Sequence, residues 1–111
     1  MELGLAGRTA IVCGASSGMG LAIAETLAAE GANVAMFARR RELLEREAER
    51  LGALPVRGDL INPADARRLV DRTLEAFGAI DILVNNGGGP PELFTSTSIP
   101  PNASTVFSTS R

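Results

Sequence analysis

The sequence contains no lysine, because all 11 of its basic residues are arginine, and it also lacks histidine, tryptophan and tyrosine. Within these 111 residues, the absences exclude a histidine-based catalytic triad, a histidine metal site, a lysine Schiff base, a Walker-type phosphate lysine and a tyrosine acid. We attribute the use of arginine alone, beside abundant alanine and glycine, to a GC-rich coding sequence. Any site must therefore be built from the remaining residue types.

Cysteine, long apolar runs and net charge are also scarce. The single cysteine excludes an internal disulfide, which fits a reducing compartment. No apolar run approaches the roughly 20 residues that span a bilayer, and no basic region precedes the first apolar segment as in a secretory signal. The net charge of -2 gives no general attraction to nucleic acid or anionic membranes. We expect a cytoplasmic protein of one domain at most, with no nucleic-acid partner, membrane partner or metal.

Apolar runs alternate with helical patterns along the chain. Runs over residues 8–15, 33–38, 54–60 and 80–86 are typical of buried parallel strands. Helical spacing follows Gly20 and covers residues 39–52, and a third helix is expected to begin at Asn62 and Pro63, which suit its N-cap and first position. Alternating strands and helices predict an α/β fold with a parallel sheet and helical crossovers.

Three glycines crowd the segment between the first expected strand and the first helix. Gly14 permits a tight turn, Gly18 allows a pyrophosphate to approach the backbone, and Gly20 allows the helix to lie close to the strand. The helix N-terminus also offers free N–H groups and the positive end of its dipole. The G-x-x-x-G-x-G spacing in this context predicts dinucleotide binding, and the alternative is a glycine-rich turn without a ligand.

The end of the second expected strand bears on the identity of the dinucleotide. An acidic residue about 20 positions beyond the glycines would hold the ribose 2′-hydroxyl of NAD, but Arg39, Arg40 and Arg41 stand there. Arginine can instead pair with a 2′-phosphate. We therefore expect NADP(H) rather than NAD, with Arg39 at the phosphate. The alternative, a solvated helix face, is the interpretation we prefer for Arg41.

The composition changes near the C-terminal end. Nine of the 17 residues from Thr95 to Arg111 are serine or threonine, against five in the preceding 94. We expect a partial dinucleotide-binding domain over residues 1–92 and an irregular Ser/Thr-rich tail over residues 93–111. The abrupt change suggests a frameshift or premature stop in a longer coding sequence, a hypothesis that the downstream DNA would test.

Four motifs in order, "CGASSGMG", "FARR", "GDL" and "DILVNNGGG", resemble the N-terminal half of the short-chain dehydrogenase/reductase family, in particular its 3-oxoacyl reductase-like members. Cys13 stands where the family has threonine, and Gly87 where it has the alanine of N-N-A-G. The resemblance implies a Rossmann-type parallel sheet with helices on both faces, truncated to about four strands in the order 3-2-1-4. Strand 4 would then be an unpaired edge, which favours self-association.

The resemblance also implies roles for individual residues. Asp59 would bind the adenine amino group, assisted by the Leu60 N–H, and the segment from Asn85 to Gly88 would stabilise the sheet and pass close to the cofactor riboses. The alternatives are an ordinary loop acid and a strand-ending turn. The full set of candidate cofactor-binding residues is Gly14, Ser16, Ser17, Gly18, Met19, Gly20, Arg39, Arg40, Asp59, Leu60, Asn86, Gly87 and Gly88.

The family's catalytic residues have no counterpart in this sequence. They are a serine, an asparagine and a Tyr-x-x-x-Lys pair that follow N-N-A-G, whereas this chain has neither tyrosine nor lysine. We name no catalytic residue, and we expect Cys13 to be a small filler. The hypothesis is the NADP(H)-binding half of an oxidoreductase that transfers hydride between NADP(H) and a carbonyl or alcohol, without turnover by this chain. The alternative is a non-catalytic nucleotide-binding or oligomerising fragment, or a truncated product without activity.

Overall fold

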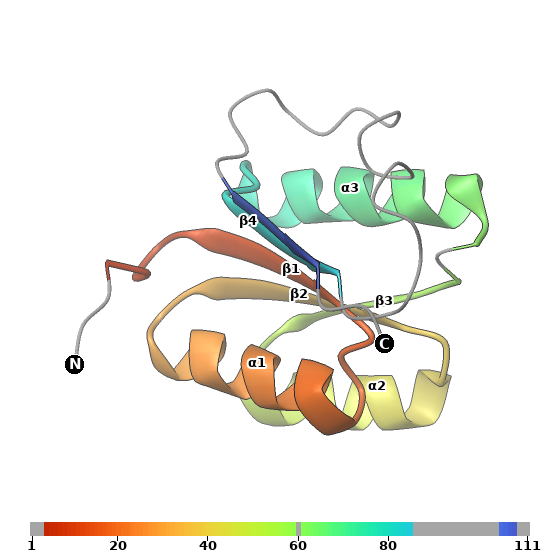
Figure 1. Cartoon of the computed structure of the whole chain (residues 1–111), viewed down its shortest axis with the longest axis horizontal. Helices are drawn as coiled ribbons and strands as arrows, with labels where there is room; N and C mark the ends of the chain where they lie inside the picture. The colour runs from red at the N-terminus through yellow and green to blue at the C-terminus, as the bar shows by residue number, and fades with distance from the viewer. Residues whose placement is uncertain (1–3, 60, 86–104, 109–111) are drawn as a thin grey trace.

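The computed structural model describes residues 4–59, 61–85 and 105–108 of the chain. Strands and helices alternate up to residue 85, as the apolar pattern predicts (Figure 1). The elements are β1 (Thr9–Cys13), α1 (Gly18–Ala29), β2 (Asn33–Ala38), α2 (Arg41–Leu51), β3 (Leu54–Arg57), α3 (Pro63–Phe77), β4 (Ile82–Asn85) and β5 (Thr105–Ser108). Among the described residues, no helix is both long enough and apolar enough to cross a membrane.

All strand pairs in the sheet are parallel, and the strand order is β3-β2-β1-β4-β5. The expected order 3-2-1-4 is therefore confirmed. In the register of the sheet, Cys13 at the end of β1 lies between Phe37 of β2 and Asn85 of β4. The carboxyl ends of β1, β2 and β4 thus meet at one edge, where open parallel sheets bind their ligands.

The fifth strand corrects two expectations. Thr105–Ser108 pairs with β4 in parallel, so the sheet has five strands, and the expectation of an irregular tail is wrong for these four residues. The edge of β4 is paired as well, which removes the unpaired edge from which self-association was expected. The physical reason is that the free N–H and C=O groups of an edge strand accept even a short segment of strand-forming residues such as Thr, Val and Phe.

Helices cover both faces of the sheet, as expected, with α1 and α2 on one face and α3 on the other (Figure 1). Because successive strand residues point to opposite faces, β1 contributes Ile11 and Cys13 to the core beneath α3 and Val12 to the core beneath α1 and α2. The α3 core is completed by Ala35, Phe37, Val56, Ala66, Leu69, Val70, Ile80 and Leu83. The opposite core is completed by Ala15, Ala24, Val34, Met36, Ala38, Leu44, Ala48 and Val84.

Most helix ends lie where the sequence signals place them. The Asn62 side chain accepts a hydrogen bond from the Ala64 N–H (3.0 Å), with Pro63 as the first residue of α3. Gly52 and Gly78 end α2 and α3 with left-handed φ angles of 71° and 82°. Helix α1 differs from the expectation, because it begins two residues before Gly20, so two glycines of the motif lie inside its first turn.

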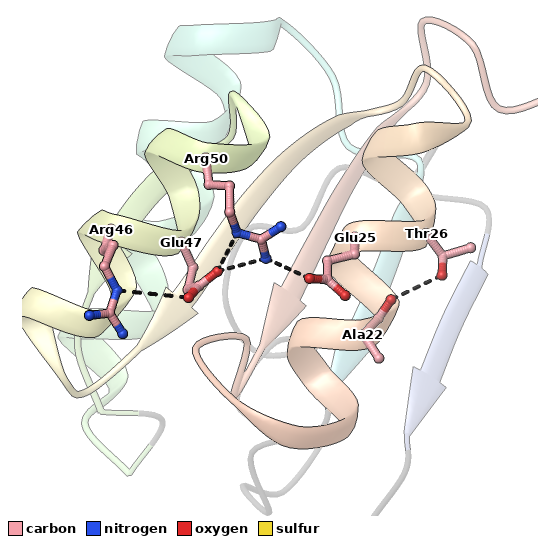
Figure 2. A network of polar contacts seen from close by, with 6 residues as sticks. All are labelled: Ala22, Glu25, Thr26, Arg46, Glu47 and Arg50. Carbon is pink, nitrogen blue, oxygen red and sulfur yellow. Dashed lines mark hydrogen bonds and ion pairs between the residues drawn. The ribbon is translucent and has the colours of Figure 1, made fainter.

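Helices α1 and α2 are joined by an ion-pair network on their exposed sides (Figure 2). The Arg50 guanidinium of α2 donates to Glu25 of α1 at 2.5 Å and to Glu47 of its own helix at 2.6 and 2.7 Å. Arg46 lies 3.9 Å from the other oxygen of Glu47. Arg50 is half exposed, so the network contributes little to stability, but it connects the helix that follows the glycine motif to the helix that follows Arg39.

Candidate functional site

The glycine loop is anchored to the neighbouring strand. At the end of β1, the Gly14 and Ala15 N–H groups both donate to the Phe37 carbonyl of β2, at 2.8 and 3.2 Å. Gly14 has a φ of 67°, a conformation that disfavours any residue with a side chain. The chain thus turns sharply away from the sheet, as expected for the first glycine, and the next residues lie above its carboxyl edge.

The first turn of α1 is left open. Ser17 is the N-cap residue, but its side chain makes no capping hydrogen bond, and the first turn contains no acidic residue. Gly18 has a φ of 61°, and a Cβ at this position would meet no atom within 4 Å, so its backbone faces open space. Gly20 is buried, as expected for a residue that allows the helix to approach the strand. Unused N–H groups at a helix start without negative charge form a ready site for phosphate.

The other predicted residues of this loop differ in exposure. Ser16 is buried at 8% relative exposure, Ser17 is exposed, and Met19 is 54% exposed. Met19 is one of two large apolar side chains that are exposed in the described part of the chain. An exposed methionine beside an open helix start adds an apolar contact surface to the polar backbone groups.

A second feature lies where β2 and β3 end. The Gly58 N–H donates to the Ala38 carbonyl at 3.0 Å, which holds the two strand ends together. Arg39 and Asp59 both line one hollow of about 660 Å³ beside these strand ends. The hollow is lined by Arg39, Glu45, Val56, Arg57, Gly58, Asp59, Asp65, Arg68 and Arg72. Arg40 is not among these residues; it is exposed and stands at the N-cap position of α2.

Asp59 is held by the first turn of α3. Its N–H donates to Asp65 at 2.9 Å, and one of its own carboxylate oxygens accepts the Ile61 N–H at 3.0 Å. Asp65 in turn forms an ion pair with Arg68 at 2.9 Å. The hydrogen bond from the Asp59 N–H, followed by that from Arg68, lowers the pKa of Asp65, so this carboxylate is ionised at neutral pH. The arrangement fixes the backbone of Asp59, which lines the hollow.

Three supporting residues were not identified from the sequence. The Phe37 carbonyl anchors the glycine loop, and Asp65 holds the Asp59 backbone N–H. Gly58 leaves room for the Phe37 ring, which a Cβ would approach to 2.7 Å. Gly58 stands directly before Asp59, and this pairing is the only sequence signal for its role. A sequence motif does not reveal a contact made by a backbone carbonyl, as at Phe37, or by a residue outside the motif, as at Asp65.

The remaining candidates are placed as follows. Cys13 is buried, and this burial raises the pKa of its thiol, which opposes thiolate formation and agrees with a filler role. Asn85 is buried at 2% relative exposure beside Cys13. Leu60, Asn86, Gly87 and Gly88 lie outside the described residues. Within the described ranges, no group of three or more metal-ligating side chains occurs.

Comparisons with known proteins identify the family of the chain. The sequence model of short chain dehydrogenases matches residues 8–109. The chain is 51% identical over 81 residues to a protein named as ketoacyl reductase 2 of the granaticin polyketide synthase of Streptomyces violaceoruber, covering 71% of this chain and 32% of that protein. It is 43% identical over 90 residues to 11-beta-hydroxysteroid dehydrogenase 1A of Arabidopsis thaliana, covering 76% of this chain and 26% of that protein.

A solved structure resembles the fold as well. L-Sorbose reductase from Gluconobacter frateurii, in complex with NADPH and L-sorbose, superposes with a TM-score of 0.70 and 39% sequence identity. The match covers 79% of this chain and 36% of the reductase. The chain thus spans about a third of the length of the relatives that it matches.

Proposed function

The chain belongs to the short-chain dehydrogenase family, and from this premise we propose that it binds NADP(H) along the carboxyl edge of its sheet. The observation that carries the proposal is the pairing of an open helix start with an arginine-lined hollow. The start of α1 offers N–H groups and no acid, and the hollow places Arg39 and Asp59 together. NADP(H) carries a pyrophosphate, a ribose 2′-phosphate and an adenine, and these groups match the N–H groups of α1, the guanidinium of Arg39 and the carboxylate of Asp59 in turn.

The residues present fit such a cofactor. The backbone of Gly18 and the N–H groups that follow it would hold the pyrophosphate, because Gly18 has no side chain and its surroundings are open. Arg39 is exposed and extends from the end of β2, where a 2′-phosphate would pair with its guanidinium. Asp65 holds the Asp59 backbone, and the Asp59 carboxylate, which lines the hollow, would accept a hydrogen bond from an adenine amino group. A bound nicotinamide dinucleotide would supply hydride, and this chain's residues would hold and orient it.

The relatives support the cofactor and suggest a substrate class. The L-sorbose reductase structure was solved with NADPH, and its substrate is a ketose that is reduced at a carbonyl. We propose that the whole protein to which these residues correspond transfers hydride between NADP(H) and a carbonyl or alcohol. The 111 residues contain neither tyrosine nor lysine, so we propose that this polypeptide binds the cofactor without turning it over.

Titration of the 111-residue chain with NADPH and NADH, followed by cofactor fluorescence, tests the proposal. We expect saturable binding with NADPH preferred, and Arg39→Asp should weaken NADPH binding by at least about tenfold while leaving NADH within a few fold, because the new carboxylate repels the 2′-phosphate. Arg67→Asp is the matched control, since Arg67 is exposed on α3 outside the hollow. Equal losses for both cofactors in Arg39→Asp would contradict the phosphate role.

A turnover assay completes the test. NADPH oxidation is followed with a panel of ketones and 3-oxoacyl thioesters, and we expect no saturable activity. Clear saturable turnover by this chain would contradict the proposal that it only binds the cofactor.

A further inference from the structure

The hollow at the ends of β2 and β3 contains guanidinium groups besides that of Arg39. Four guanidinium groups line it, from Arg39, Arg57, Arg68 and Arg72, against three carboxylates. The question is which of these charges are compensated within the protein and which remain for a ligand.

The carboxylates are already engaged. Asp65 forms an ion pair with Arg68, and Arg68 also donates to the Arg57 carbonyl, so the charge of Arg68 is compensated by Asp65 within the protein. Glu45 forms an ion pair with Arg41, outside the hollow, at 3.5 Å. Asp59 accepts the Ile61 N–H, as described above. Within residues 4–59 and 61–85, no ion pair involves Arg39, Arg57 or Arg72.

Arg57 is the uncompensated arginine that lies beside Arg39. It ends β3 and pairs in register with Ala38, the residue that directly precedes Arg39. It is exposed, so its guanidinium is free to move toward a ligand, and it stands two residues before Asp59. The charge of Arg57 also helps to lower the pKa of Asp65, after the Asp59 N–H and Arg68. Asp65 lines the same hollow as Arg57.

We propose that Arg57 is a second specificity residue for the 2′-phosphate, which it and Arg39 hold from the ends of two adjacent strands. The inference rests on the proposed function, since it assumes that the chain binds NADP(H). A phosphate monoester carries a charge of about -1.5 to -2 at pH 7 and three acceptor oxygens, so one guanidinium neither neutralises it nor occupies all its oxygens. Asp65 does not compete with the phosphate for Arg57, because the two carboxylate oxygens of Asp65 are bound to the Asp59 N–H and to Arg68.

The test is a calorimetric titration of the 111-residue chain with two fragments of the cofactor, adenosine 2′,5′-bisphosphate and 5′-AMP. The two fragments differ only in the 2′-phosphate. In Arg57→Ala, we expect the bisphosphate to bind about tenfold more weakly and 5′-AMP to change by less than about twofold. Arg57→Lys keeps the charge and should recover part of the loss. The matched control is Arg67→Ala, which should leave both affinities unchanged because Arg67 lies outside the hollow.

A pH series separates a phosphate contact from a structural role. The second ionisation of the phosphate lies near pH 6, so bisphosphate affinity should rise between pH 5 and pH 7, and the rise should be smaller in Arg57→Ala. Equal losses for both fragments in Arg57→Ala, or a larger selective loss in Arg72→Ala, would overturn the role of Arg57. Failure of the unchanged chain to bind NADPH would overturn the proposed function itself, and the inference with it.

Discussion

Helices α1 and α3 begin in opposite ways, although both follow a parallel strand at the same edge of the sheet. Helix α3 has a side-chain cap from Asn62, a proline at its first position and Asp65 in its first turn. Helix α1 has no side-chain cap, no proline and no acid, and glycines stand at its first and third positions. The chain therefore satisfies the start of α3 internally and leaves the N–H groups and dipole of α1 for something else.

The difference shows how a structural helix start is distinguished from one that is available to a ligand. A capped start gains about 1 kcal/mol from its own side chain, and its acid repels an incoming anion. An uncapped start forgoes that stabilisation and is compensated only when an anion binds. In this chain the acid of α3 accepts the backbone N–H of Asp59, so the capped start supports the segment that lines the hollow.

The largest expected effect comes from making α1 resemble α3. Ser17→Asp adds a cap and a negative charge at the open start, which should raise Tm by a few degrees through the helix dipole. The same charge repels the pyrophosphate, so NADPH affinity should fall by at least about tenfold in a fluorescence titration. Ser17→Ala is the uncharged control, with NADPH affinity expected within a few fold. Undiminished NADPH binding in Ser17→Asp would mean that the pyrophosphate lies elsewhere.

The second change makes α3 resemble α1. Asn62→Ala removes the cap to the Ala64 N–H, and we expect the free energy of unfolding to fall by about 1 kcal/mol, measured by denaturant titration. NADPH affinity should change by less than about twofold, since Asn62 is exposed and does not line the hollow. Asn62→Ser keeps a capping oxygen and serves as the control. A purely structural role for this cap would be contradicted if the free energy of NADPH binding fell by more than the free energy of unfolding.

The smallest expected effect is a pH dependence of stability at the start of α3. The pKa of Asp65 is lower in the folded protein, so its ionised form stabilises the fold above about pH 4 and this contribution disappears as the pH falls through the lowered value. Asp65→Asn retains an acceptor for the Asp59 N–H but loses the charge, at a cost of roughly half a kcal/mol or less near neutral pH.

Thermal melts at successive pH values check this dependence. The difference in Tm between the parent and Asp65→Asn should be largest above pH 5 and should shrink toward pH 3. Asp71→Asn, at an exposed position on the same helix, is the control. A Tm difference between the parent and Asp65→Asn that grew as the pH fell would contradict the expected pH dependence.

Local signals in the sequence predicted much of the fold. The strand over residues 33–38 has the bounds that its apolar run indicates, and α3 begins after the N-cap Asn62 as expected. These features depend on backbone preferences of single residues and on periodicity, which act over a few positions. Arg39 and Asp59, which the sequence singled out for different parts of a dinucleotide, line the same hollow, because parallel strands share one carboxyl edge.

Other features depended on contacts between distant segments. Strand β5 is four residues in a segment without strand periodicity, and the free edge of β4 determines its pairing. The proposed role of Arg57 follows from its register with Ala38, which no local pattern reveals.

The sequence by itself determined the alternation of strands and helices, the open glycine loop and the absence of lysine and tyrosine, because each of these is a property of neighbouring residues or of composition. Only the tertiary structure decided that Asp65 holds the Asp59 backbone, that Gly58 makes room for Phe37 and that Arg57 stands beside Arg39. These relations come from strand register and from packing across the sheet, which bring together residues that are far apart along the chain.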